Sequence, residues 1–282
     1  MSRISSIAGR HGELKLAFER RNGSTALAAS FFRVPLQVMK PRYDAPGCAC
    51  VYLLSPTGGV VQGDDYQIEV TLATNTHAIL TTQAATKVYA MPKHDASQSM
   101  RVQVGQDAFF EYLPDPTILF RDANFSQSIA LSLERGAKVA LQEIVMPGRL
   151  ARGESLAFTR FASRVEASNT DGLFLFDACC IQPDRQSYLT KLAVLEGYTC
   201  WGSWYLIGDY EMPEWEPFCA FAEPRLNQPS KSSGGMSRLH QSGVAIRMLA
   251  HNAGTIYSAF QGIWNWLKLE HFGLDSVDLR KY

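Results

Sequence analysis

The sequence predicts a mainly β fold, either an antiparallel β-rich sandwich or a stacked β-hairpin (β-helix-like) architecture. A few helices are expected, including an amphipathic helix near the C-terminus. Three observations lead to this prediction. Short runs of alternating apolar and polar residues recur through the middle of the chain, turn residues separate them, and a helical period appears only near the end. Strands spaced in this way favour sandwiches or stacked hairpins over βαβ units.

The first clear strand covers residues 67–72. Ile68, Val70 and Leu72 alternate there with polar side chains, which is the period of a strand with one buried face. A polar turn comes next at residues 73–77.

Two hairpins are predicted after this strand. In the first, residues 100–104 alternate, residues 105–107 form a turn, and residues 108–112 return. In the second, residues 129–134 alternate, a turn lies at Arg135 and Gly136, and residues 138–146 run back.

Near the C-terminus the pattern changes to that of a helix. Lys268 and His271 lie in its expected last turn, and Gly273 suits the position just after a helix. The apolar residues recur at i, i+4, i+7, i+8 and i+11, which places on one face Ile256, Phe260, Ile263, Trp264 and Leu267.

Residues 223–238 are rich in Pro, Ser and Gly, and we predict that they form a mobile surface loop. The segment after this loop is too short to be a domain of its own. The whole chain, residues 1–282, is therefore predicted to be a single domain.

The charge balance excludes several classes of partner. The 27 Lys and Arg residues equal the 27 Asp and Glu residues, so the formal net charge is zero. Proteins that bind nucleic acid or anionic membranes usually need a basic excess. No apolar run approaches the roughly 20 residues of a membrane span, and the first residues lack the apolar segment of a secretory signal. We expect a cytoplasmic protein that binds neither nucleic acid nor membrane.

The cysteines and histidines give little indication of a metal cage or of catalysis. Six cysteines are too few for a disulfide scaffold in a chain of this length, so reduced thiols are expected. Cys48 and Cys50 are followed by no second pair at the spacing of a zinc site, and the histidines are scattered. Protease, hydrolase and metalloprotease motifs are absent from the sequence. Four cysteines are interpreted as small buried apolar residues: Cys179, Cys180, Cys200 and Cys219.

Two carboxylates interrupt apolar strand patterns. Glu143 shares a face with the apolar residues of segment 139–145. Asp177 shares a face with Leu173 and Leu175 in a run that is apolar on both sides. Burying an ionised carboxylate without a partner costs several kcal/mol or shifts its pKa. Each residue is therefore either half of a buried ion pair or a contact point for a cation.

A Gly-rich loop covers residues 55–65. Gly58, Gly59 and Gly63 suit turn positions with positive φ angles. The loop is not a Walker A motif, because no Lys-Ser/Thr comes after the glycines, and it lacks the helical pattern that the GxGxxG fingerprint requires next.

Four ordered blocks of sequence resemble the family of the urease accessory protein UreD, which is called UreH in some organisms. The blocks are residues 55–64, 81–89, 110–120 and 148–154, and weaker similarity reaches segment 243–249 and the helix with Trp264 and Trp266. The resemblance covers most of the chain from about Leu14 onward. The residues that carry it are Gly58, Gly59, Gly63, Gln83, Lys87, Tyr89, Glu111, Pro114, Asp115, Gly148, Arg149, Gly153 and Glu154.

Two segments depart from the family pattern. The chain ends in Arg280-Lys281-Tyr282, whereas the family often ends in an Arg-x-Trp tail. Residues 197–238 align poorly, so no role is transferred to them.

The resemblance implies a non-catalytic chaperone for nickel insertion into urease. Members of the family are β-rich, join UreF and the GTPase UreG, and dock on the urease apoprotein. Nickel is thought to pass through their interior, so the ion is a cargo in transit and no tightly bound cofactor is expected. The positions of this sequence that match the proposed path are Asp64, Thr86, Glu143 and Asp177.

Two alternatives remain open from the sequence. The protein could store nickel itself, although paired His and Cys ligands are scarce, or it could be a β-rich enzyme or carbohydrate-binding module, since 11% of its residues are aromatic. Charged residues make up only 19% of the chain, and under the family interpretation the apolar remainder would cover interfaces with UreF and urease. We therefore expect the isolated chain to be poorly soluble.

Overall fold

The structure, a computed structural model, describes residues 10–185, 189–191, 194–210, 213–239 and 243–279. The first nine residues and the divergent tail at 280–282 lie outside this part, so the expectations placed on them stay untested. Among the described residues, no helix is both long enough and apolar enough to cross a membrane.

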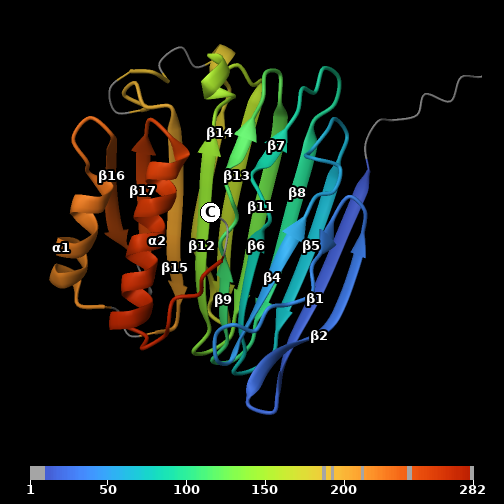
Figure 1. The fold of residues 1–282 in the computed structure, drawn as a ribbon, viewed down its shortest axis with the longest axis vertical. Helices are drawn as coiled ribbons and strands as arrows, with labels where there is room; N and C mark the ends of the chain where they lie inside the picture. The colour runs from blue at the N-terminus through green and yellow to red at the C-terminus, as the bar shows by residue number, and fades with distance from the viewer. Residues whose placement is uncertain (1–9, 186–188, 192–193, 211–212, 240–242, 280–282) are drawn as a thin grey trace, which may run out of the picture.

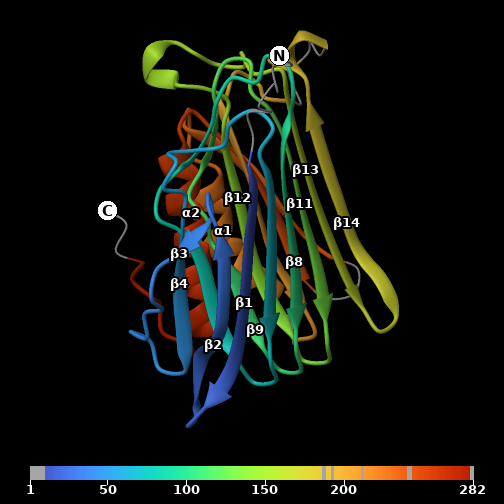
Figure 2. The same cartoon turned by 90° about the vertical axis from the view of Figure 1, so that its right-hand side faces the viewer.

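Two β-sheets stack face to face and form the body of the molecule (Figures 1 and 2). The smaller, seven-stranded sheet has the order β14-β13-β11-β8-β5-β1-β2. Its strands in chain order are β1 (His11–Arg21), β2 (Ser24–Arg33), β5 (Asp65–Leu72), β8 (Ala96–Val104), β11 (Asn124–Leu133), β13 (Arg160–Asn169) and β14 (Gly172–Ile181).

The larger, ten-stranded sheet has the main order β16-β17-β15-β12-β9-β6-β4-β3, and the short strands β7 and β10 pair beside this path. Its strands in chain order are β3 (Gln37–Val38), β4 (Cys48–Leu54), β6 (His77–Thr82), β7 (Thr86–Val88), β9 (Phe109–Tyr112), β10 (Thr117–Leu119), β12 (Lys138–Met146), β15 (Cys200–Gly208), β16 (Ser232–Arg238) and β17 (Gly243–Ala250).

Between β5 and β13 the chain alternates between the two sheets, and neighbouring strands within each sheet run parallel. The mainly β, stacked architecture is confirmed, but both predicted hairpins are wrong. β8 and β9 belong to different sheets, and so do β11 and β12. At residues 105–107 and 135–137 the chain crosses from the smaller sheet to the larger sheet. A tight turn allows this crossing as readily as it allows a hairpin.

The helices α1 (Trp215–Leu226) and α2 (Ala253–Glu270) cover the outer face of the larger sheet (Figure 2). The predicted apolar face of α2 is confirmed, because all five residues that define it are buried against the sheet. Two short 3₁₀ turns, Leu150–Arg152 and Pro183–Arg185, complete the elements. One apolar core fills the space between the sheets, and a second lies between the larger sheet and the helices.

The prediction of a mobile loop at residues 223–238 is wrong. Helix α1 continues to Leu226 with Pro224 in its last turn, and β16 pairs along its length with β17. Pro is tolerated there because Phe218, Ala222 and Leu226 anchor the helix in the second core. Tertiary packing thus overrides the local loop composition.

A β-bulge changes the predicted faces of β14. Ala167 pairs with Leu175 but Ser168 pairs with Leu173, so Phe174 is an extra residue. As a result Leu173 is 62% exposed, while Phe174 packs against the inter-sheet core. Leu175 and Asp177 stay on the inward face as predicted.

Candidate functional site

Glu143 projects from β12 into the space between the two sheets. Its neighbours Leu141 and Val145 on the same face belong to the inter-sheet core, as the sequence predicts. Gln127 and Ser163, on the facing sheet, both donate hydrogen bonds to its Oε2. Burial raises the pKa of Glu143 above its usual value, and the two hydrogen bonds offset only part of that rise.

A row of polar side chains leads to Glu143 across the inner face of the smaller sheet. The strand register aligns one residue from each of five strands: Tyr66, Gln98, Gln127, Ser163 and Cys179. We call this set the polar row. It lies between apolar rows on both sides, one of which includes Phe125 and Phe161 and the other Met100 and Ile129.

Glu143 also borders two hollows between the sheets. A cavity of about 40 Å³ is lined by Thr86, Gln98, Gln127 and Glu143, among others, and has room for roughly two water molecules. A cleft of about 560 Å³ lies on the other side and is lined by Glu143 and Asp177. Three of the four residues predicted for the nickel path therefore line adjoining hollows that meet at Glu143.

Asp177 lies at the wall of the cleft and is already paired. The hydroxyl of Tyr205 donates a hydrogen bond to Asp177 Oδ2, and Arg247 Nη2 forms an ion pair with the same oxygen. Neither partner is suggested by the sequence pattern, because both belong to strands of the opposite sheet.

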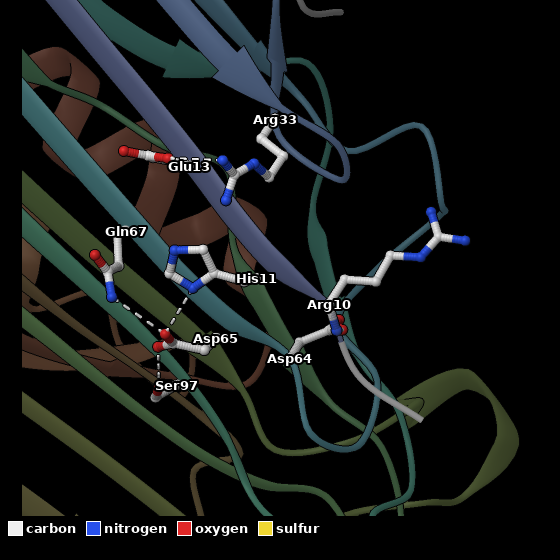
Figure 3. Close-up of polar contacts among 8 residues, drawn as sticks. All are labelled: Arg10, His11, Glu13, Arg33, Asp64, Asp65, Gln67 and Ser97. Atoms are coloured by element: carbon white, nitrogen blue, oxygen red, sulfur yellow. Dashed lines mark hydrogen bonds and ion pairs between the residues drawn. The ribbon is translucent and has the colours of Figure 1, made fainter. Parts of the chain in front are cut away.

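Asp64 lies at the far end of the polar row and is 3% exposed. Its carboxylate accepts hydrogen bonds from the backbone amides of Arg10 (3.0 Å) and Val61 (2.9 Å) and from the hydroxyl of Tyr66 (2.6 Å). Figure 3 shows Asp64 beside Arg10, where β1 begins. Among the described residues, Asp64 is not part of the lining of either hollow; its hydrogen bond from Tyr66 joins it to the first residue of the polar row.

The adjacent carboxylate, Asp65, belongs to a different environment. It accepts hydrogen bonds from Ser97 (2.7 Å) and Gln67 (3.2 Å) and contacts the His11 ring nitrogen at 3.1 Å (Figure 3). Its side chain is 46% exposed. Asp64 directly precedes β5, and the alternation of side chains into this strand places Asp64 inside and Asp65 outside.

The Gly-rich loop packs tightly against β7. Gly58, Gly59 and Gly63 all have positive φ angles, as predicted. A side chain on Gly59 would come within 2.4 Å of the carbonyl oxygen of Lys87 and 2.7 Å of the Tyr89 ring. The Lys87 and Gln83 side chains are exposed, so this pair of blocks presents polar groups at the surface.

The third block builds a buried polar network under α2. Glu111, which is 0% exposed, accepts hydrogen bonds from Trp264 Nε1 at 2.6 Å and Lys268 Nζ at 3.3 Å, and contacts His77 Nε2 at 2.7 Å. Burial alone would raise the pKa of Glu111, but Lys268, His77 and Trp264 hold it at about 2. Nearby, the Asp115 amide donates to the Thr82 hydroxyl.

The remaining motif residues shape neighbouring segments. The Pro114 carbonyl accepts a hydrogen bond from Gln142. In the fourth block, Arg149 forms an ion pair with Glu154, which is 7% exposed and also accepts from the Arg121 amide. Two glycines of that block, Gly148 and Gly153, have positive φ angles.

The thiols do not lie where the sequence suggested. Cys200 is buried, Cys219 is half-buried, and Cys179 and Cys180 are exposed on β14, so the prediction of burial is wrong for these two. An edge strand has no neighbour to cover it on one side. None of the six cysteines, all of which lie in the described part of the chain, forms a disulfide bond. Among the described residues, no group of three or more His, Cys, Asp or Glu side chains is arranged to hold a metal ion.

Comparison with known proteins identifies the family. The model of the UreD urease accessory protein family matches residues 10–281. The chain belongs to the UreD family. It is 31% identical over 277 residues to a urease accessory protein UreD of Haloarcula marismortui, covering 97% of this chain and 91% of the relative. The UreD of Cenarchaeum symbiosum is 31% identical over 278 residues, with 97% and 96% coverage. UreD 2 of Brucella suis is 29% identical over 273 residues, with 94% and 89% coverage.

Membership in the UreD family gives the chain a role in urease maturation. The four motif blocks lie around the loops and strands that connect β4 to β10, and at the turn after β12. The sequence therefore predicts the family correctly. Six residues of the site were not indicated by the sequence: Tyr66, Gln98, Gln127, Ser163, Tyr205 and Arg247.

Proposed function

We propose that this protein is a non-catalytic scaffold that links UreF and UreG to the urease apoprotein and lets nickel pass toward the urease active site through its interior. The observation that carries the proposal is the polar row, which crosses the apolar inter-sheet core and contacts Glu143 through Gln127 and Ser163, where the cavity and the cleft adjoin. An apolar core gains nothing from such a row, because buried polar groups cost free energy unless they are paired.

The chemistry of the row suits an ion in transit. Carboxylates, hydroxyls and amide oxygens bind Ni²⁺ through single contacts and bridging water, so each residue along the path holds the ion weakly. Glu143 attracts the ion most strongly, because it is an anion that borders both hollows. The dispersed arrangement favours transit over storage, which would need several ligands at one point.

The partners would cover the exposed apolar residues at the two ends of the stack. Phe31 and Phe32, on the edge strand β2, are 48% and 40% exposed, and Val34 and Met39 lie close by in the chain. At the opposite edge, Phe176 on β14 is 58% exposed. Large apolar side chains concentrated at sheet edges are typical of surfaces that bind other proteins. Two separated surfaces agree with a scaffold that holds UreF on one side and urease on the other.

The test is urease activation in cells that carry Glu143→Gln or Asp177→Asn in place of the native protein. We expect both variants to co-purify with UreF and with urease, while the purified urease contains less nickel and is less active. Gln and Asn keep the shape of the side chains and remove the negative charge that attracts the cation.

Glu166→Gln is the matched control, because Glu166 lies on β13 and pairs with Arg164 in a half-exposed ion pair. It should activate urease normally. Full nickel loading by both path variants would refute the path, and a loss of UreF binding would show that the two carboxylates are structural.

A further inference from the structure

Arg247 lies in line with Glu143 in the larger sheet. The register of β12, β15, β17 and β16 forms the row Glu143, Ser203, Arg247 and Gly235. The small Ser203 side chain separates the two charged groups, so the Arg247 charge acts on Glu143 as well as on Asp177. On the other side, a Cβ added at Gly235 would meet no described atom within 4 Å, and Gly235 and Arg247 both line the cleft.

The guanidinium of Arg247 covers the carboxylate of Asp177. Its Nη2 contacts Asp177 Oδ2, and its Cζ lies 4.9 Å from the centroid of the Tyr205 ring. The Tyr205 hydroxyl donates to the same carboxylate oxygen. A protein cation therefore already occupies the place where a metal ion would meet Asp177.

This ion pair is easily broken. Arg247 is 49% exposed and Asp177 29% exposed, and half-exposed pairs contribute little net free energy because water solvates both charges. The cleft of about 560 Å³, which Arg247 and Gly235 both line, gives the Arg247 side chain room for a second position.

We propose that Arg247 is the gate of the nickel path, an inference that rests on the proposed function. Arg247 pairs with Asp177 when no metal ion is present, and it swings toward Gly235 when a divalent cation enters the cleft. The tethered positive charge keeps abundant cations from settling between Glu143 and Asp177. A cation delivered at high local concentration replaces it, since both compete for the same oxygen. Arg247 would thus set how tightly the cleft binds Ni²⁺, without binding the ion itself.

The experiment measures Ni²⁺ binding to the purified full chain by equilibrium dialysis. Arg247→Gln should tighten Ni²⁺ binding by about tenfold, because it removes a competing charge. Arg247→Lys keeps the charge and should bind as weakly as the native chain. Arg164→Gln, which breaks a similarly exposed ion pair on β13, should also leave the affinity unchanged.

The gain must depend on the carboxylate that Arg247 covers. In the double variant Arg247→Gln with Asp177→Asn, the tenfold gain should disappear. The gate is refuted if Arg247→Gln binds Ni²⁺ no more tightly than the native chain, or if the gain persists without Asp177.

These outcomes separate the gate from the path. If Asp177→Asn lowers the nickel content of urease while Arg247→Gln leaves affinity unchanged, the path holds and the gate fails. If Arg247→Gln tightens binding through Asp177 but Asp177→Asn activates urease normally, Arg247 controls cation entry to a cleft that urease maturation does not use.

Discussion

The indole nitrogen of Trp264 donates a hydrogen bond of 2.6 Å to the carboxylate of Glu111, which is 0% exposed. The two residues are 153 positions apart, one on α2 and the other on β9. Lys268, one turn further along α2, brings a positive charge to the same carboxylate oxygen. These contacts join the third motif block to the C-terminal helix and fix where α2 lies on the sheet.

We predict that Glu111→Gln destabilises the protein by about 3 kcal/mol, because it leaves Lys268 buried without an anion. Lys268 is only 2% exposed, so water cannot replace the lost partner. Urea unfolding measures the difference. The surface variant Glu166→Gln should cost less than about 1 kcal/mol. Equal losses for the two variants would contradict the prediction.

The stabilisation from Glu111 should also depend on pH. Its pKa falls from 4.5 to about 2 in the folded protein, so its contribution is fully present above pH 4.5 and is lost as pH falls from 4.5 toward 2. The difference in unfolding free energy between the native chain and Glu111→Gln should stay constant from about pH 7 to about pH 5.5. It should then shrink at lower pH. A difference that stayed constant down to about pH 3 would show that Glu111 has no depressed pKa.

Local patterns predicted the elements better than their pairing. Alternation correctly located β5, β8, β11 and β12, and the helical period located α2, because burial on one face leaves a direct mark on the sequence. The hairpins were wrong because a turn with Gly or Asp looks the same whether the chain returns to its own sheet or crosses to the other. Strand pairing depends on the whole fold, so it cannot be predicted from the alternation within a single strand.

The polar row shows a similar limit. Gln98, Gln127 and Ser163 each stand two residues before a buried apolar residue on the inner face, and this signal is visible in every strand separately. Only the parallel register shows that these positions align and lead to Glu143. Glu143 and Asp177 could be singled out from sequence, because a lone charge in an apolar pattern needs a reason. Arg247 could not, because it lies on an exposed position of an ordinary alternating strand.

The close approach at Gly59 predicts a steric effect in the Gly-rich loop. Gly59→Ala would place a Cβ 2.4 Å from the Lys87 carbonyl oxygen, so β7 or the loop must shift. Gly47→Ala is the control, since Gly47 also has a positive φ, of 74°, but a Cβ there meets no atom of the described residues within 4 Å. Thermal or urea unfolding should show that Gly59→Ala costs about 1–3 kcal/mol more than Gly47→Ala. Similar losses would mean that only backbone conformation matters there.

The apolar residues on β2 predict a change in solubility. Replacing both Phe31 and Phe32 with Ser should raise the concentration at which the isolated chain stays monomeric, because two aromatic side chains no longer face water. Light scattering measures this. Neither residue packs in a core, so the unfolding free energy should change by less than about 1 kcal/mol. If the native isolated chain already remains monomeric at high concentration, the partner surface proposed for this edge is wrong.

We predict that the Glu143 carboxylate lowers the free energy of unfolding at neutral pH. Burial raises its pKa above the usual 4.5, so the folded state disfavours the charged form, and stability falls as pH rises through 4.5 toward the folded pKa. Glu143→Gln removes this cost. Parallel urea unfolding curves should show the variant to be at least as stable as the native chain at neutral pH, with an advantage that disappears below about pH 4.

The same substitution should lower the nickel content of urease, and the opposite signs of the two effects are the informative result. A residue retained only for packing would lose stability and activation together when replaced. Glu143→Gln tests this directly, because the amide fills the same volume and can still accept the hydrogen bond from Ser163. A variant that is less stable than the native chain and also fails to activate urease would assign Glu143 to the framework, and the carboxylate would then have no part in moving the ion.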